Sequence, residues 1–348
     1  MSSAEDRAST PRQDATVAAD RAVERAYDSR PSFDVRLAEA LKRRLKRRVQ
    51  QGLRAALGGA GRVAAGQSGG ESRSTGPVQR ILVVRLDLLG DVVLSLPAVR
   101  ALKRAYPDAR IDMLVLRSTA DILRAEPEVA RVHTFDPSAW RRPTGLLKPR
   151  TWHDARALLR ELRGARYDLA LSVSGDIASI LARLSGARRR FGYADEAYRH
   201  FLTDTLPGGR YQAHQHEVRY VLALAAAAGG IVAPGDERLS LHVQPDATRF
   251  MAEQLRQWRE QTELRGPVVA IHAGARNGQA KRWPTAHFAT LADRLVRELD
   301  ALIVLTGAPN EEPLARAIVR RTQRPVLNLT GRTTIPELVA LLATSDLL

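Results

Sequence analysis

Short apolar runs alternate with longer amphipathic segments from about residue 80 to the end of the chain. The apolar runs predict buried strands at 81–85, 111–116, 131–134 and 168–173, near 188–193, and again at 268–272, 301–305 and 326–329. The amphipathic segments between them predict helices, among them 178–184 and 212–228, the latter ending at Gly229 and Gly230. Strands that alternate with helices are typical of parallel sheets, so the pattern predicts an α/β protein.

The pattern also divides the chain into three regions. Residues 1–78 form an extension: 1–35 are polar and expected to be disordered, 36–57 are predicted to form a basic helix, and a Gly- and Ser-rich linker follows. We expect a first domain over 79–240 and a second over 241–348. A length of 348 residues is compatible with two domains.

Charge is concentrated in the extension. The net charge is +16, and residues 41–62 contain eight Lys or Arg and no acidic residue. Leucines and a valine recur every fourth residue from Leu37 to Leu57, so residues 36–57 would form a basic amphipathic helix that suits an anionic membrane surface. A solvated tail is equally compatible with the composition. Because no aromatic residue interrupts the basic run, base stacking is disfavoured and nucleic acid is not an expected partner.

The first predicted strand runs directly into a turn that contains Gly90 and Asp91. We expect Gly90 to allow a sharp turn and to leave room for a ligand. Asp91 would place a carboxylate at the carboxyl end of the first strand, the edge at which open α/β sheets bind ligands. The alternative is that Asp91 only caps the following helix, and both interpretations stay open.

A second strand, turn and helix start lie at 267–284, and the turn carries Arg276, Lys281 and Arg282. Loop amides, a helix N-terminus and a lysine together are typical of a phosphate-binding site. The segment lacks the spacing of a Walker P-loop, and neither turn contains GxGxxG. The chain therefore has one turn with a carboxylate and one with cations.

Several motifs, in this order and spacing, resemble glycosyltransferase family 9, the heptosyltransferase-like group. They are Arg85-Leu-Asp-x-x-Gly-Asp91, Arg190-Phe-Gly-Tyr193, His216-Glu217, His272-Ala-Gly-Ala275, Lys281-Arg-Trp-Pro284 and Gly307-Ala-Pro-Asn-Glu311. The resemblance covers about residues 79–348.

The resemblance implies a GT-B fold, in which two Rossmann-like domains face each other across a cleft. It implies inverting, metal-independent transfer of a sugar, heptose in the best-known members, from a nucleotide donor such as ADP-heptose. Asp91 would be the catalytic base. On the donor side, Lys281 would contact the phosphates, Glu311 the ribose, and the loop with Gly274 and Ala275 would hold the diphosphate.

On the acceptor side, the resemblance implies a lipopolysaccharide or related glycan near Gly90. Arg141 and Arg142 lie in a Pro-rich loop that would either contact an anionic acceptor or remain a solvated surface loop. Family members continue past the position of Ser345–Leu348 with a further strand and donor-site segment, so we expect the second domain to be incomplete. Enzymes of this kind need no cofactor.

Other classes of protein fit the residues less well. A non-catalytic nucleotide- or sugar-binding protein on the same fold is the main alternative. A dinucleotide-dependent oxidoreductase would need GxGxxG in the first turn. His214 and His216 are a weak candidate for a metal pair. With no Cys, no apolar run of about 18 residues and no apolar leader, the sequence is typical of a cytoplasmic protein, peripheral on the inner face of the cell membrane if the basic helix binds there.

Overall fold

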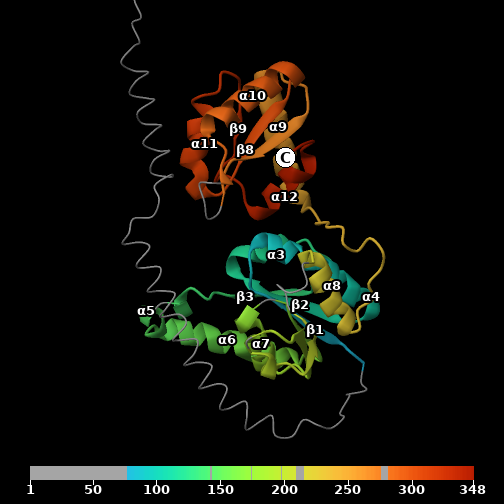
Figure 1. Cartoon of the computed structure of the whole chain (residues 1–348). Helices are drawn as coiled ribbons and strands as arrows, with labels where there is room; N and C mark the ends of the chain where they lie inside the picture. Colours follow the sequence, from blue (N-terminus) through green and yellow to red (C-terminus); the bar gives the residue numbers. More distant parts are fainter. Residues whose placement is uncertain (1–76, 142, 174, 197, 209–214, 276–280) are drawn as a thin grey trace, which may run out of the picture. The chain divides into compact units, whose positions relative to one another are not determined.

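The computed structural model describes residues 77–348 except 142, 174, 197, 209–214 and 276–280. The extension, with its predicted basic helix at 36–57, therefore lies outside the described residues. The described chain forms two compact units, one ending at His242 and the other beginning at Val243 (Figure 1). The domain limits 79–240 and 241–348 stay a prediction.

The first unit alternates strands and helices along the chain. Its elements are β1 (Arg80–Arg85), α3 (Leu89–Val93), α4 (Leu96–Ala105), β2 (Arg110–Leu116), η2 (Arg117–Leu123), β3 (Arg131–Phe135), η3 (Ala139–Arg141), α5 (Pro143–Leu146), α6 (Pro149–Ala165), β4 (Leu169–Ser172), α7 (Gly175–Leu184), β5 (Arg189–Tyr193), η4 (Arg199–Phe201), β6 (Asp204–Leu206) and α8 (Glu217–Ala227).

All six strands of this unit are parallel, in the order β3-β2-β1-β4-β5-β6. This is the strand order of a Rossmann fold. Ile81 pairs with Ile111 on one side and with Leu169 on the other, so β1 is a central strand. The order reverses between β1 and β4, and the carboxyl end of β1 therefore lies at the switch point, where such sheets bind ligands.

Helices cover both faces of this sheet, with α4 and α8 on one side and α6 and α7 on the other (Figure 1). Residues 81–84 are fully buried, as expected for a strand that is covered on both faces. Leu82 and Val84 pack with Leu162 of α6 and Ala178 of α7 in one hydrophobic cluster. The side chains therefore fix β1 and the turn after it in the centre of the unit.

The segment after α8 is attached to the first unit by charged side chains. Arg104 donates to the carbonyl of Ile231 at 2.8 Å, and Arg100 to that of Ser240 at 2.8 Å. The fully buried carboxylate of Glu126 accepts the His242 N–H at 2.8 Å and pairs with Arg100 at 3.2 Å. These contacts extend up to the last residue of the unit.

The second unit has the same alternation on a smaller scale. Its elements are α9 (Pro245–Thr262), β7 (Val268–His272), α10 (Thr285–Leu299), β8 (Leu302–Thr306), η6 (Pro309–Glu311), α11 (Glu312–Val319), β9 (Leu327–Asn328) and α12 (Ile335–Thr344). The strands form a parallel sheet in the order β7-β8-β9, and Leu347 forms a parallel bridge with Val269 of β7.

Alternate residues of β7 face opposite sides of this sheet, as the two-residue period of a strand requires. Val269 and Ile271 join a cluster with residues of α10 and α11, whereas Val268 and Ala270 join one with residues of α9 and α12. The second unit is therefore also a three-layer α/β/α arrangement.

The predicted α/β class, with two Rossmann-like units of GT-B type, is confirmed, and each predicted strand is present within two residues of its expected limits. The helix predicted at 212–228 begins only at Glu217. His216 has an extended backbone and accepts the Val218 N–H through its side chain, so it caps the helix and ends the preceding segment. The three-residue strand β6 was not predicted, because so short a run carries no period. Among the described residues, no helix is both long and apolar enough to cross a membrane.

Candidate active site

The turn after β1 presents Asp91 at the third residue of α3. Its Oδ2 accepts the Leu88 N–H at 3.3 Å, and its backbone carbonyl accepts the Ser95 hydroxyl at 2.9 Å. Asp91 therefore does stabilise the first turn of the helix, at the third position rather than at the N-cap. The contact with the Leu88 N–H involves only Oδ2, and the second carboxylate oxygen, Oδ1, has a different neighbour.

That other oxygen faces Arg85, the last residue of β1. The Arg85 side chain is completely buried and meets three carboxylates. Its Nη2 lies 3.2 Å from Asp91 Oδ1, its Nε 3.2 Å from Asp87 Oδ2, and its Nη1 2.9 Å from Glu217 Oε1. Nη1 also approaches the carbonyl of Val173 at 3.5 Å, directly after β4.

The electrostatics of this cluster follow from its burial. A buried guanidinium is stable only when it is paired, and here the carboxylates outnumber it. The side chains of Asp91, Asp87 and Glu217 are 26%, 28% and 18% exposed, so each is open to solvent on one side. The switch point of the first sheet is therefore an acidic, partly open surface with a buried cation beneath it.

Two tyrosines pack beside this cluster. Tyr193 of β5 and Tyr220 of α8 stack with ring centroids 3.9 Å apart, and the Tyr193 hydroxyl donates to the carbonyl of Tyr220 at 2.7 Å. Burial, with the charges of Glu217 and Asp195, raises the pKa of Tyr193 to about 12. The tyrosine therefore stays neutral and acts as a packing and hydrogen-bonding group that joins β5 to α8.

The turns of the second unit bring Glu311 and Gly274 together. Glu311 is the third residue of η6, and its Oε2 accepts the Ala308 N–H at 2.8 Å. A Cβ atom at Gly274, just after β7, would collide with the Glu311 carboxylate, and one at Gly307 would lie 2.8 Å from Oε2. Glycine at both positions is thus what admits the carboxylate. His272 Nε2 lies 3.9 Å from Glu311 Oε2.

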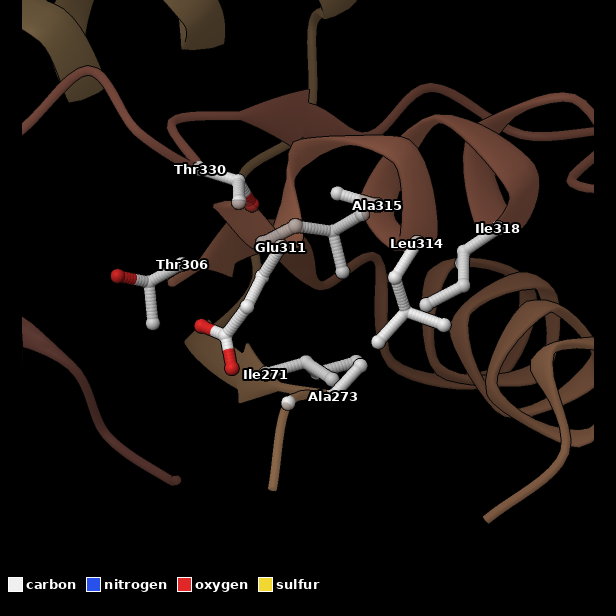
Figure 2. A pocket seen from close by; sticks show the side chains of 10 residues that line it. Ile271, Ala273, Thr306, Glu311, Leu314, Ala315, Ile318 and Thr330 are labelled. Atoms are coloured by element: carbon white, nitrogen blue, oxygen red, sulfur yellow. The ribbon is translucent and has the colours of Figure 1, made fainter. Parts of the chain in front are cut away.

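Glu311 lines one side of a small pocket between β7, β8 and α11 (Figure 2). Its apolar lining consists of Ile271, Ala273, Leu305, Leu314, Ala315 and Ile318. Figure 2 shows the Glu311 carboxylate directed toward Thr306 and Ile271. The hydroxyl of Thr330, also in the lining, is buried and has no hydrogen-bond partner among the described residues. At about 10 Å³ the pocket has room for no more than one water molecule, so it is not itself a site for a nucleotide.

The other predicted site residues lie as follows. Gly90 is the second residue of α3 with no positive φ, and a Cβ there would meet nothing within 4 Å. The expectation that Gly90 is needed for a sharp turn is therefore wrong, although the space above it is open. Ala275 is half-buried, and Lys281 is exposed just after residues 276–280, which lie outside the described residues together with Arg276.

Arg141 ends η3, and Arg142 is outside the described residues. Of the weak metal pair, His214 is also outside them, and His216 uses Nδ1 to cap α8. Trp283 is 49% exposed and packs edge-on against Phe288, in line with a packing role in its turn.

Sequence reasoning did not assign Arg85 and Glu217 to the site, although both belong to recognised motifs. The available signal was an arginine at the end of an otherwise apolar strand. A charge in a position that is expected to be buried requires a partner, but the sequence does not say which carboxylate supplies it.

Two Rossmann-like units in one chain are the architecture of the GT-B fold, which fits a glycosyltransferase but does not by itself fix that activity. The model of glycosyltransferase family 9 (heptosyltransferase) matches residues 155–348, and the chain belongs to this family. The protein is therefore a glycosyltransferase.

Individual relatives agree with this assignment. Lipooligosaccharide heptosyltransferase 2 of Haemophilus ducreyi is 30% identical over 281 residues, which cover 76% of this chain and 74% of that protein. The solved structure of a family 9 glycosyltransferase from Veillonella parvula has a TM-score of 0.65 at 19% identity, over 78% of this chain and 74% of that one. The ADP-heptose lps heptosyltransferase II of E. coli has a TM-score of 0.60 at 24% identity, over 77% of both chains. These structures share the fold of this protein.

Proposed function

We propose that this glycosyltransferase transfers a heptose from ADP-heptose, or a closely related nucleotide sugar, to a lipopolysaccharide or related glycan acceptor, with Asp91 as the general base. The observation that carries the role of Asp91 is its position at the switch point of the first sheet. One oxygen is held by the Leu88 N–H, the other by Arg85, and the carboxylate is 26% exposed. The names of the similar enzymes support the donor and acceptor classes.

In the proposed reaction, Asp91 accepts the proton of the acceptor hydroxyl while the oxygen attacks the anomeric carbon of the donor. The bond between that carbon and the nucleoside diphosphate breaks, and the diphosphate leaves with the bonding electrons. Attack from the opposite side inverts the configuration. A group placed where charge develops on the leaving phosphate is a large catalytic contribution, and Lys281 supplies it without a metal ion.

The donor site is proposed at the edge of the second sheet. The exposed side chain of Lys281 suits a diphosphate beside Gly274 and Ala275. The Glu311 carboxylate, fixed by the Ala308 N–H, suits a pair of ribose hydroxyls as hydrogen-bond donors. Arg141 and Arg142 are proposed as contacts to an anionic acceptor.

The decisive test of this function is Asp91→Asn, assayed with ADP-heptose and a heptose-deficient lipopolysaccharide acceptor. We expect turnover to fall about 10²–10⁴-fold, because asparagine cannot accept the proton, while ADP affinity measured by calorimetry stays within about twofold. Asp121→Asn, in η2, where the carboxylate is 46% exposed and pairs with Arg124, is the matched control and should behave as the unmodified protein. Near-normal turnover in Asp91→Asn would leave Asp91 as a helix-stabilising residue only.

A second part of the proposal concerns location. The basic segment 36–57 would hold the enzyme on the inner, anionic face of the cell membrane, where a lipid-linked acceptor is accessible. Each Lys or Arg near such a surface contributes about 1 kcal/mol, and salt weakens the attraction.

Removal of residues 1–76 should therefore abolish salt-sensitive sedimentation with phosphatidylglycerol vesicles and spare turnover on a soluble acceptor. Vesicle binding that survives the deletion would assign the contact to the two folded units instead, and the extension would then be a solvated tail.

A further inference from the structure

We infer that Arg85 and Glu217 together position Asp91 for catalysis, with Glu217 fixing the direction of the guanidinium and the guanidinium fixing the carboxylate. The inference rests on the proposed role of Asp91 as the base. It adds Arg85 and Glu217 as positioning residues, which lie 132 residues apart in the sequence.

The first step of the argument is the anchorage of Arg85. Its side chain is fully buried, so the charge has no solvent to compensate it. Nη1 donates to Glu217 Oε1 at 2.9 Å and approaches the Val173 carbonyl at 3.5 Å. One end of the guanidinium is thus tied to the start of α8 and to the end of β4, both outside the turn that carries Asp91.

The second step is the planarity of the group. A guanidinium presents its N–H groups in a rigid fork, so anchoring Nη1 also sets the directions of Nη2 and Nε. Those two nitrogens are buried and form ion pairs, 3.2 Å from Asp91 Oδ1 and 3.2 Å from Asp87 Oδ2, without a directed hydrogen bond to a described residue. A lysine has one ammonium on a flexible stem and cannot hold three carboxylates in fixed directions.

The third step concerns what fixes Glu217 itself. It is the first residue of α8, directly after the cap residue His216, whose Nδ1 accepts the Val218 N–H at 3.4 Å. α8 packs against α4, the helix that follows the Asp91 turn, and Tyr220 of α8 stacks on Tyr193. Glu217 is therefore mounted on a packed element, which gives the arginine a rigid anchor.

The consequence for catalysis is geometric. Proton transfer requires the base within hydrogen-bond distance and in the correct direction, and errors of about 1 Å cost roughly 10²-fold in rate. The backbone contact from Leu88 N–H restrains only one oxygen of Asp91, at 3.3 Å. The ion pair with Arg85 restrains the other, so loss of the anchor would lower kcat without changing the donor site in the second unit.

The test uses the full chain with Arg85→Met, Arg85→Lys, Glu217→Leu and Glu217→Gln. We expect Arg85→Met to lower kcat about 100-fold and Glu217→Leu to lower it at least about tenfold. In both variants the KM for ADP-heptose and the affinity for ADP should stay within about twofold of the unmodified protein. Glu217→Gln keeps a hydrogen-bond acceptor for Nη1 and should recover most of the loss. Arg85→Lys keeps the charge without the fork and should remain about tenfold below the unmodified protein.

The matched control is Arg100→Met, which removes another ion pair of the same unit, that with the fully buried Glu126. It should lower the melting temperature while kcat stays within about twofold, so destabilisation alone is distinguished from loss of positioning.

The outcomes separate this inference from the proposed function. A kcat within twofold of the unmodified protein in folded Arg85→Met or Glu217→Leu, beside an inactive Asp91→Asn, overturns the positioning role alone. Normal turnover in Asp91→Asn overturns both. If Arg85→Met and Glu217→Leu show no cooperative melting, Arg85→Lys decides: an unchanged kcat at an unchanged melting temperature overturns the inference, and a tenfold loss at constant KM supports it.

Discussion

The turn after β1 and the turn after β8 have the same local construction in two different units. Each places an acidic residue, Asp91 or Glu311, at the third position of a short helix, and each carboxylate accepts the N–H of the residue three positions earlier. The two carboxylates differ in what lies around them. Asp91 faces the buried guanidinium of Arg85, whereas Glu311 lies against Gly274 and Gly307, with His272 at 3.9 Å.

This difference shows two ways of fixing a carboxylate at the edge of a parallel sheet. In the first unit the direction of Asp91 depends on charges that come from distant parts of the chain, above all Glu217. In the second unit Glu311 is fixed by its own turn and by the absence of side chains at two nearby glycines. A long-range ion pair suits a group that must keep one direction during proton transfer. The two glycines make room for the Glu311 carboxylate itself, whose side chain is 16% exposed, so its position depends on the absence of side chains and not on an ion pair.

The largest expected effect that separates the two units is on donor binding, through Lys281 in the loop between β7 and α10. Lys281→Ala should weaken the affinity for ADP about 10–100-fold, because a charged hydrogen bond contributes about 1.5–3 kcal/mol. Binding of the acceptor should change little. Arg294→Ala, an exposed cation on α10, is the control for general charge loss. Calorimetry that shows equal ADP affinity in both variants would remove Lys281 from the donor site and leave the loop after β7 without a phosphate contact.

Two glycines, Gly90 in the first unit and Gly274 after β7 in the second, give a smaller contrast. In Gly274→Ala the new methyl group collides with the Glu311 carboxylate and displaces it, so we expect ADP affinity to fall about tenfold or more, since a hydrogen bond to a charged group contributes about 1.5–3 kcal/mol. In Gly90→Ala the methyl group enters open space on a helix, so the free energy of unfolding should rise by about 0.5–1 kcal/mol.

Calorimetry and chemical denaturation measure the two effects. Unchanged ADP affinity in Gly274→Ala would separate Glu311 from the donor. A drop in kcat in a stabilised Gly90→Ala would indicate that the acceptor occupies the space above that residue.

The last prediction concerns how the stability of the first unit depends on pH. Asp112 of β2 is buried. Burial raises its pKa, but hydrogen bonds with His133, Tyr167 and Arg110 outweigh this and hold the pKa below the usual value for an aspartate. A folded-state pKa below the unfolded one means that the unfolded chain takes up the proton first. The stabilisation is therefore complete above about pH 4 and is lost as the pH falls further.

Asp112→Asn should lower the free energy of unfolding by about 1–3 kcal/mol at pH 7, with a smaller difference from the unmodified protein at pH 3. Denaturant titrations at the two pH values measure both numbers. An equal difference at pH 3 and pH 7 would show that the charge of Asp112 contributes nothing.

The sequence by itself determined the alternation of strands and helices, the two α/β units and the motifs of family 9. It also indicated the turns that carry Asp91 and Glu311, because the turn that follows a strand of a parallel α/β sheet lies at the carboxyl edge of that sheet. These features follow from local periodicity and from residues that are neighbours in the chain, and such information is present in the sequence itself.

Only the tertiary structure decided which groups meet. The pairing of Arg85 with Glu217 spans 132 residues, and it depends on the strand order β1-β4-β5 and on the packing of α8 against α4. The contact of Gly274 with Glu311 depends on the pairing of β7 with β8. The sequence indicated that a buried arginine needs a counter-ion and that a glycine leaves room for another group. Many carboxylates in the chain could pair with the buried arginine or fill the space beside the glycine. Only the packing decides which carboxylate lies within reach.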